Sequence, residues 1–145
     1  MRKFILSVIV LSLVGLVSPL KAQLNDGHER LKNHINSVVE KVEEAESPLH
    51  KREILDGSLE EMIQAIDKVK EKKSVSESDK KGLAVFKDNL VDRKNELNGL
   101  NGFKKVPNNQ LNQYANYIQQ NVEQADAVTI SVTTALLIVI ILLLL

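Results

Sequence analysis

The chain has 145 residues, with 19 basic side chains, 19 acidic side chains and no cysteine. This charge balance gives no electrostatic reason to expect nucleic acid or anionic lipid as a partner. The absence of cysteine excludes the disulfide framework on which small extracellular folds generally depend, so apolar packing or assembly must hold the fold together.

The start of the chain has the features of a secretory signal peptide. A positive segment (residues 1–3) precedes an apolar run of 14 residues (4–17) and a helix-breaking stretch (18–22) that ends on a small residue. This order predicts a signal peptide at residues 1–22 that is cleaved after Ala22. Three of the 19 basic residues lie in this peptide, so 16 basic residues remain against 19 acidic ones, a net charge of −3.

The exported chain is predicted to be helical, because its apolar residues recur at intervals of three and four. The first segment runs from about residue 27 to residue 46, with Asn25 or Asp26 as its N-cap. Ser47 and Pro48 end this segment and start the next one, since Ser caps helices well and Pro suits the first helical position.

The second and third segments contain several start and stop signals. A kink or a new helix start is expected at Gly57, because Ser58 opens a capping box directly after it. Ser76 and Asp79 form a second capping box, and the two glycines of residues 98–102 should end the third segment. The apolar positions expected to face the core in the first three segments are Leu31, Ile35, Val38, Val42, Ala45, Leu55, Leu59, Met62, Ile66, Val69, Leu83, Phe86, Leu90 and Leu97.

The fourth segment begins near Asn108 or Asn109. Nothing breaks the helical pattern after Gln110, so we expect one continuous helix from about residue 109 to residue 145 in the uncleaved chain. The four segments predict an all-α fold, a small antiparallel bundle of three or four amphipathic helices, and their spacing is also compatible with coiled-coil association. The apolar stripe of the fourth segment is expected at Leu111, Ala115, Ile118, Val122 and Ala125.

The last 19 residues, 127–145, contain no ionisable side chain. At ~1.5 Å per helical residue they would extend about 28 Å, close to the ~30 Å thickness of the hydrocarbon core of a bilayer. A retained transmembrane helix normally has Lys or Arg on its cytoplasmic side, and none follows in this sequence. The pattern therefore favours the removable signal of a glycosylphosphatidylinositol (GPI) anchor, with a retained transmembrane helix as the alternative.

A GPI signal needs small residues at the attachment position and two positions further on, then a polar spacer and an apolar tail. Ala125 with Ala127 meets the first requirement, residues 126–134 form a spacer of nine residues, and residues 135–145 form an apolar tail of 11 residues. Asp126 is the alternative attachment residue. The predicted organisation is a signal peptide (1–22), a helical ectodomain (23–125) on the extracellular face of the plasma membrane, and a C-terminal hydrophobic GPI signal or transmembrane segment (126–145).

The sequence offers little that could carry catalysis. His28 and His34 lie six positions apart, on different helix faces, and His50 lies in another segment, so none has the partner four positions away that a helical zinc site needs. The acidic pairs have basic neighbours at helical spacing, and no glycine-rich phosphate loop is present. We therefore expect no metal, no cofactor and no enzymatic activity.

The fourth segment has an unusual composition, with ten Asn and Gln residues and a single charge between residues 108 and 124. Amides and tyrosines can make many contacts with little charge desolvation, so this segment is a candidate face for recognition or self-association, and a plain solvated helix face is the alternative. The residues expected to form the face are Gln113, Tyr114, Asn116, Tyr117 and Gln120.

These features favour a small helical surface protein that acts by protein contact or as a homo-oligomer, with the outer leaflet of the membrane as its support. The alternative is a membrane-tethered extracellular carrier whose core opens around a fatty acid or a sterol. The narrow apolar stripes argue mildly against the carrier.

Overall fold

The computed structural model describes residues 26–145, except the side chains of residues 26 and 125–129, so the predicted signal peptide and its cleavage after Ala22 lie outside the described residues. All regular structure in the described part is helical, which confirms the predicted fold class. The helices in chain order are α2 (Asp26–Glu44), α3 (Pro48–Lys70), α4 (Glu77–Asn98), the short 3-10 helix η2 (Asn108–Gln110), α5 (Leu111–Thr129) and α6 (Val132–Leu144).

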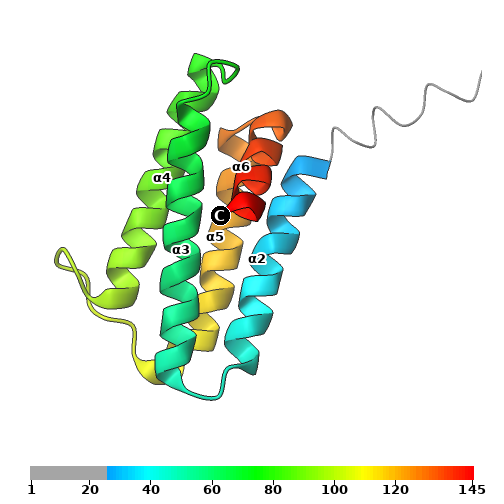
Figure 1. The fold of residues 1–145 in the computed structure, drawn as a ribbon. Helices are drawn as coiled ribbons and strands as arrows, with labels where there is room; N and C mark the ends of the chain where they lie inside the picture. The colour runs from blue at the N-terminus through cyan, green and yellow to red at the C-terminus, as the bar shows by residue number, and fades with distance from the viewer. Residues whose placement is uncertain (1–25) are drawn as a thin grey trace, which may run out of the picture.

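Helices α2 to α5 alternate in direction and lie side by side, and α6 turns back from α5 to pack against α2 and α3 (Figure 1). The four long helices α2 to α5 match the three or four helices expected for the bundle, and the hydrophobic C-terminal segment forms a separate helix, α6, instead of continuing α5. The turn before α3 and the loop before α5 lie at one end of the bundle, here called the loop end. The start of α2 and the turn between α5 and α6 lie at the other end, here called the tail end (Figure 1).

The helix boundaries follow the predicted capping residues. The Oγ of Ser47 accepts a hydrogen bond from the backbone N–H of His50 at 3.1 Å at the start of α3. The Oγ of Ser76 accepts one from the N–H of Asp79 at 3.1 Å at the start of α4. Gly99 ends α4 with a φ of 68°, a left-handed conformation that suits glycine because it has no Cβ.

The kink or new helix start expected at Gly57 is wrong, because α3 is one helix. Leu55 and Leu59, on either side of the glycine, are each 2% exposed. Burying a side chain of this size contributes about 1.5 to 3 kcal/mol, whereas a glycine inside a helix costs about 1 kcal/mol. The continuous apolar stripe therefore outweighs the local signal at Gly57 and Ser58.

The predicted stripes form one core that runs the length of the bundle. Val38 and Ala45, which the pattern also placed inward, are only partly buried. The side chain of Ala125 is outside the described set. The largest side chains that are almost completely buried are Phe86, Leu31, Leu55, Leu59, Met62, Ile66, Leu83, Leu90, Leu97, Leu111, Ile138 and Val42.

The continuous final helix expected from residue 109 to residue 145 is also wrong. The chain leaves the helical conformation at Ile130 and Ser131, whose ψ angles are 152° and 158°. The Oγ of Ser131 then accepts a hydrogen bond from the N–H of Thr134 at 3.3 Å and caps α6. Residues 128–134 are Val, Thr, Ile, Ser, Val, Thr and Thr, whose branched or hydroxyl side chains favour helices less than Ala or Leu does, so a break here costs little.

Helix α6 completes the apolar core at the tail end. Its inward side chains are buried, with Ala135 and Ile138 at 0% exposure. A Cβ built on Gly27 would lie 2.2 Å from the carbonyl oxygen of Val132, so the backbones of α2 and α6 touch at this point. None of the described helices is both long enough and apolar enough to span a membrane.

Candidate interaction site

A groove of about 510 Å³ lies at the loop end of the bundle, between the end of α4, the loop of residues 99–107 and the start of α5. It contains three of the five residues that the sequence placed on a recognition face. The residues that line it are Glu96, Lys104, Lys105, Val106, Pro107, Gln110, Gln113, Tyr114 and Tyr117.

The two tyrosines of the groove have different roles. Tyr114 is only 7% exposed, and its hydroxyl donates a hydrogen bond to the carbonyl oxygen of Arg93 at 2.7 Å and contacts a carboxylate oxygen of Glu96 at 3.0 Å. Burial and the neighbouring Glu96 raise the pKa of Tyr114 well above its usual value. Tyr114 therefore joins α5 to α4 and forms the floor of the groove, whereas Tyr117 is 41% exposed and available for contact.

Arg93 of α4 holds the wall of the groove in place. Its guanidinium forms an ion pair with Glu96 at 2.9 Å and a hydrogen bond to the hydroxyl of Tyr117. The guanidinium carbon also lies 5.1 Å from the centre of the Tyr117 ring, within the range of a cation–π contact. These contacts fix the orientation of an exposed aromatic ring.

The loop of residues 99–107 is tied to the bundle by Arg52 of α3. Its guanidinium donates hydrogen bonds to the carbonyl oxygens of Leu97 and Val106, the latter at 2.7 Å, and to the side-chain oxygen of Asn108 at 3.0 Å. Val106 itself is buried, and its N–H donates to the carbonyl oxygen of Glu96 at 3.3 Å. The base of the loop is therefore held by directed hydrogen bonds.

The loop presents apolar and cationic side chains together. Leu100 is 53% exposed and Phe103 is 37% exposed, and both belong to the nine residues that connect α4 to η2. Lys104 and Lys105 are exposed and form no ion pair with another described residue. An aromatic ring, an aliphatic side chain and two cations in one loop, with the two cations lining the groove, have the chemistry to contact apolar and carboxylate groups.

The amides of α5 are partly used within the bundle. The side chain of Asn116 donates to the carbonyl oxygen of Asn112 at 3.1 Å, one turn earlier in the same helix. Gln119 donates to the side-chain oxygen of Asn36 and joins α5 to α2. Gln113 lines the groove, and Gln120 is exposed.

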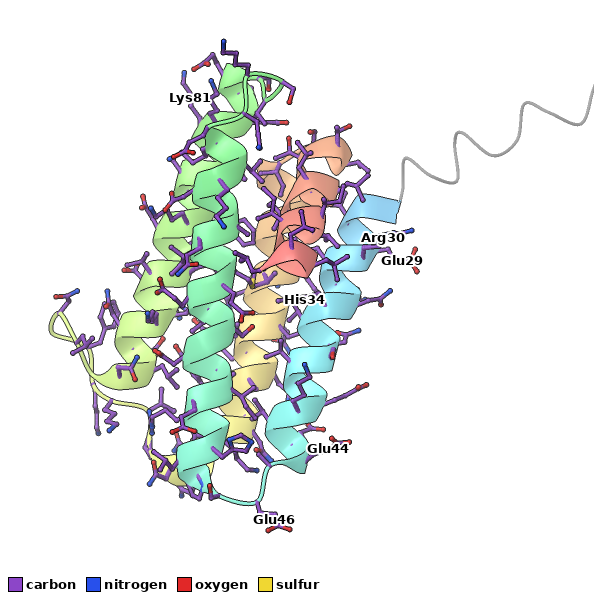
Figure 2. The ribbon with its side chains drawn as sticks, in the orientation of Figure 1. Glu29, Arg30, His34, Glu44, Glu46 and Lys81 are labelled. Carbon is purple, nitrogen blue, oxygen red and sulfur yellow. The ribbon has the colours of Figure 1, made fainter. Side chains whose placement is uncertain are left out.

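The three histidines do not meet. His34 lies half-buried on α2 (Figure 2), and its Nε2 has no hydrogen-bond partner. Burial lowers its pKa below 6.5, although the nearby Glu61 carboxylate acts in the opposite direction. The folded state therefore favours the neutral ring, and this contribution to stability is lost as the pH falls through the lowered pKa. No three His, Asp or Glu side chains in the described part are placed to hold a metal ion.

One pocket between the helices is too small to hold a ligand. A pocket enclosed by α2, α3 and α5 measures about 10 Å³, roughly the volume that one water molecule needs. Comparison with protein-family models, curated proteins and solved structures found no match to this chain.

Proposed function

We propose that this chain is a cell-surface protein, attached to the outer leaflet of the plasma membrane through its C-terminal segment, that acts by protein contact at the groove of the loop end. The observation that carries the contact function is a groove of about 510 Å³ lined by the exposed Tyr117, Lys104 and Lys105, with the exposed Leu100 and Phe103 in the loop that borders it.

The position of the groove supports this proposal. The predicted attachment residues, Ala125 or Asp126, belong to the last turns of α5, toward the tail end. The groove is lined by the first turns of α5, at the opposite end of the same helix. A protein anchored at residue 125 would therefore direct its groove away from the membrane, where another protein can reach it.

The carrier is the weaker proposal, because the enclosed pocket beside Leu59 measures about 10 Å³, whereas a fatty acid needs a cavity of several hundred Å³. Thermal melting of the exported chain with and without fatty acid tests the carrier directly. A carrier gains stability in proportion to ligand occupancy, and a contact protein does not.

The contact function is tested by photo-crosslinking on intact cells. A photoreactive amino acid at Leu100 should give adducts with a surface protein, and Lys104→Glu with Lys105→Glu should remove them by reversing the charge beside the groove. Leu49 is the matched control position, since it is 69% exposed and lies in the first turn of α3 at the same end, and not in the loop that borders the groove. Equal adducts from Leu49 and Leu100, or none from Leu100, would contradict the proposal.

The attachment is tested with Ala125→Leu combined with Asp126→Leu. This double variant removes the small attachment residues and makes the segment more apolar. Under GPI anchoring, surface display should collapse, and phosphatidylinositol-specific phospholipase C should release the wild-type protein from cells. Ile130→Leu with Val132→Leu changes the same segment, keeps the small residues and should be displayed normally. Normal display of the 125/126 variant would instead indicate a retained helix.

A further inference from the structure

Helix α6 is apolar on all sides, but the bundle covers only one of them. Ala135 and Ile138 are completely buried against the bundle, whereas Leu143 and Leu144 are 75% and 81% exposed. Ile140 is also 44% exposed. Docking therefore leaves a large part of this uncharged helix in water, and a bilayer would bury the remainder as well.

The polar attachment of α6 is confined to its first turn. The hydroxyls of Ser131 and Thr134 donate to the same carboxylate oxygen of Asp79, at 2.6 and 2.5 Å. Apart from the contacts of this turn with Asp79, no side-chain hydrogen bond or ion pair between described residues joins α6 to the rest of the bundle. Beyond this turn, the helix is held by apolar contact, which a hydrocarbon environment can replace.

The surface beneath α6 is shaped for a closely packed helix. Gly27 allows the approach, since a Cβ at this position would lie 2.2 Å from the carbonyl oxygen of Val132 and 3.0 Å from the backbone nitrogen of Leu136. Both are backbone atoms, so a larger residue at position 27 must displace α6. Gly57 in the middle of α3 is different, because nothing lies within 4 Å of a Cβ built there.

We propose that the surface formed by α2 and α3 is a binding site for an uncharged apolar helix, that α6 fills it in water, and that α6 leaves it when a bilayer is present. This inference rests on the proposed membrane attachment. It adds an earlier step, in which α6 leaves α2 and α3 before the C-terminal segment enters the membrane. After release, residues 127–145 can form the continuous helix that their spacing predicts, because only the link at Ile130 and Ser131 interrupts it. The bundle thus shields its own tail from water until the membrane accepts it.

The test uses the chain from residue 23 to residue 145, which has no native cysteine to interfere with labelling. Spin labels on Glu40→Cys and Leu144→Cys, both exposed positions, report the distance between α2 and the end of α6 by pulsed electron paramagnetic resonance. Phosphatidylcholine vesicles should increase this distance by roughly 30 Å or more, because reversing 13 residues at ~1.5 Å each moves the far end by about twice the helix length.

Gly27→Ala and Gly57→Ala form a matched pair of variants. Gly27→Ala should populate the long distance already in water, and Gly57→Ala should give the wild-type distribution. A Gly27→Ala distribution identical to the wild type would overturn the binding site. Circular dichroism shows whether the four long helices of each variant remain folded.

Flotation with the vesicles separates this inference from the proposed attachment. Protein that floats with an unchanged label distance overturns the release of α6 and leaves membrane attachment standing. Protein that remains in solution contradicts release, whatever surface display on cells shows. The display experiment could contradict the GPI anchor while the label distances still change as predicted for vesicles and for Gly27→Ala. The binding site for α6 would then remain supported.

Discussion

Helices α4 and α6 both pack against α3, but they are held in different ways. Three polar contacts join α4 to α3, with side-chain separations of 2.5 to 2.7 Å, whereas the polar contacts of α6 lie in one turn and reach only Asp79. Directed contacts add to the packing of side chains a further preference for one register of the two helices. The contacts between α3 and α4 are Asp67 with Lys87, Glu60 with Lys94, and Asp56 with Asn98.

The pKa values of Glu60 and Lys94 show how one of the pairs between α3 and α4 is stabilised. The hydrogen bond from Lys94 lowers the pKa of Glu60, and the same bond raises the pKa of Lys94, so both groups stay charged over a wide pH range. Each pair is partly exposed, and its energy is therefore modest. Their combined effect is to favour one arrangement of α3 and α4, whereas α6 lacks such pairs and is the helix that we propose can exchange the bundle for a bilayer.

The largest expected effect comes from placing a charge in each helix. Leu90 of α4 is 1% exposed, and Leu90→Asp should abolish cooperative thermal unfolding, because a buried, unpaired carboxylate costs several kcal/mol. Leu144→Asp in α6 is the control, because the side chain is 81% exposed, and its melting curve should match the wild type. Circular dichroism measures both. A Leu90→Asp variant that melts like the wild type would show that α4 does not depend on its core.

A smaller effect is expected at Arg52, which joins α3 to the end of α4 and to the loop of the groove. Arg52→Ala leaves the carbonyl oxygens of Leu97 and Val106 without their donor and should lower the free energy of unfolding by about 2 kcal/mol. Arg52→Lys should recover only part of this, since lysine lacks the planar fork. Lys51→Ala, which removes an exposed hydrogen bond to Asn112, should change stability by less than about 0.5 kcal/mol. Equal losses at the two positions would contradict the special role of Arg52.

The sequence predicted the features that depend on neighbouring residues. Ser47 and Ser76 cap helices as expected, because a cap needs only the next three residues. It missed the turn at Ser131, because that turn depends on the surface of α2 and α3 and on Asp79, 52 positions earlier. It also missed Arg52, whose three acceptors lie 45 to 56 positions away.

The sequence predicted the exposure of only some residues of the candidate site. Tyr117 was correctly placed on the outside of α5, but Tyr114 was placed there too, and it lies in the core at 7% exposure. The signal was present, since Leu111, Tyr114 and Ile118 have the spacing of the buried stripe. The loop residues Leu100 and Phe103 were not singled out, because exposure in a loop has no periodic pattern.

Two serine N-caps, at the starts of α3 and α6, test whether α6 is held less firmly than the other helices. Ser47→Ala and Ser131→Ala each remove an Oγ that accepts a backbone N–H, at a typical cost of about 1 kcal/mol. Ser47→Ala should lower the melting temperature of the whole bundle. Ser131→Ala should speed amide hydrogen exchange in α6 and leave exchange in α4 unchanged, because α6 opens separately. Matching exchange profiles in the two variants would mean that α6 unfolds only together with the bundle.

The smallest expected effect is a gain in stability at Gly57. This glycine lies inside α3 with helical backbone angles, and a Cβ would meet nothing within 4 Å, so Gly57→Ala adds no contact and removes none. The change should raise the free energy of unfolding by about 0.5 to 1 kcal/mol, because alanine has less conformational freedom to lose on folding. Thermal melting at neutral pH measures it. Gly27→Ala has the same chemistry and should instead lower stability, because its Cβ meets the backbone of α6, so opposite signs at the two glycines would locate the close contact between α2 and α6. A gain at both positions would mean that α6 does not lie against Gly27 in solution.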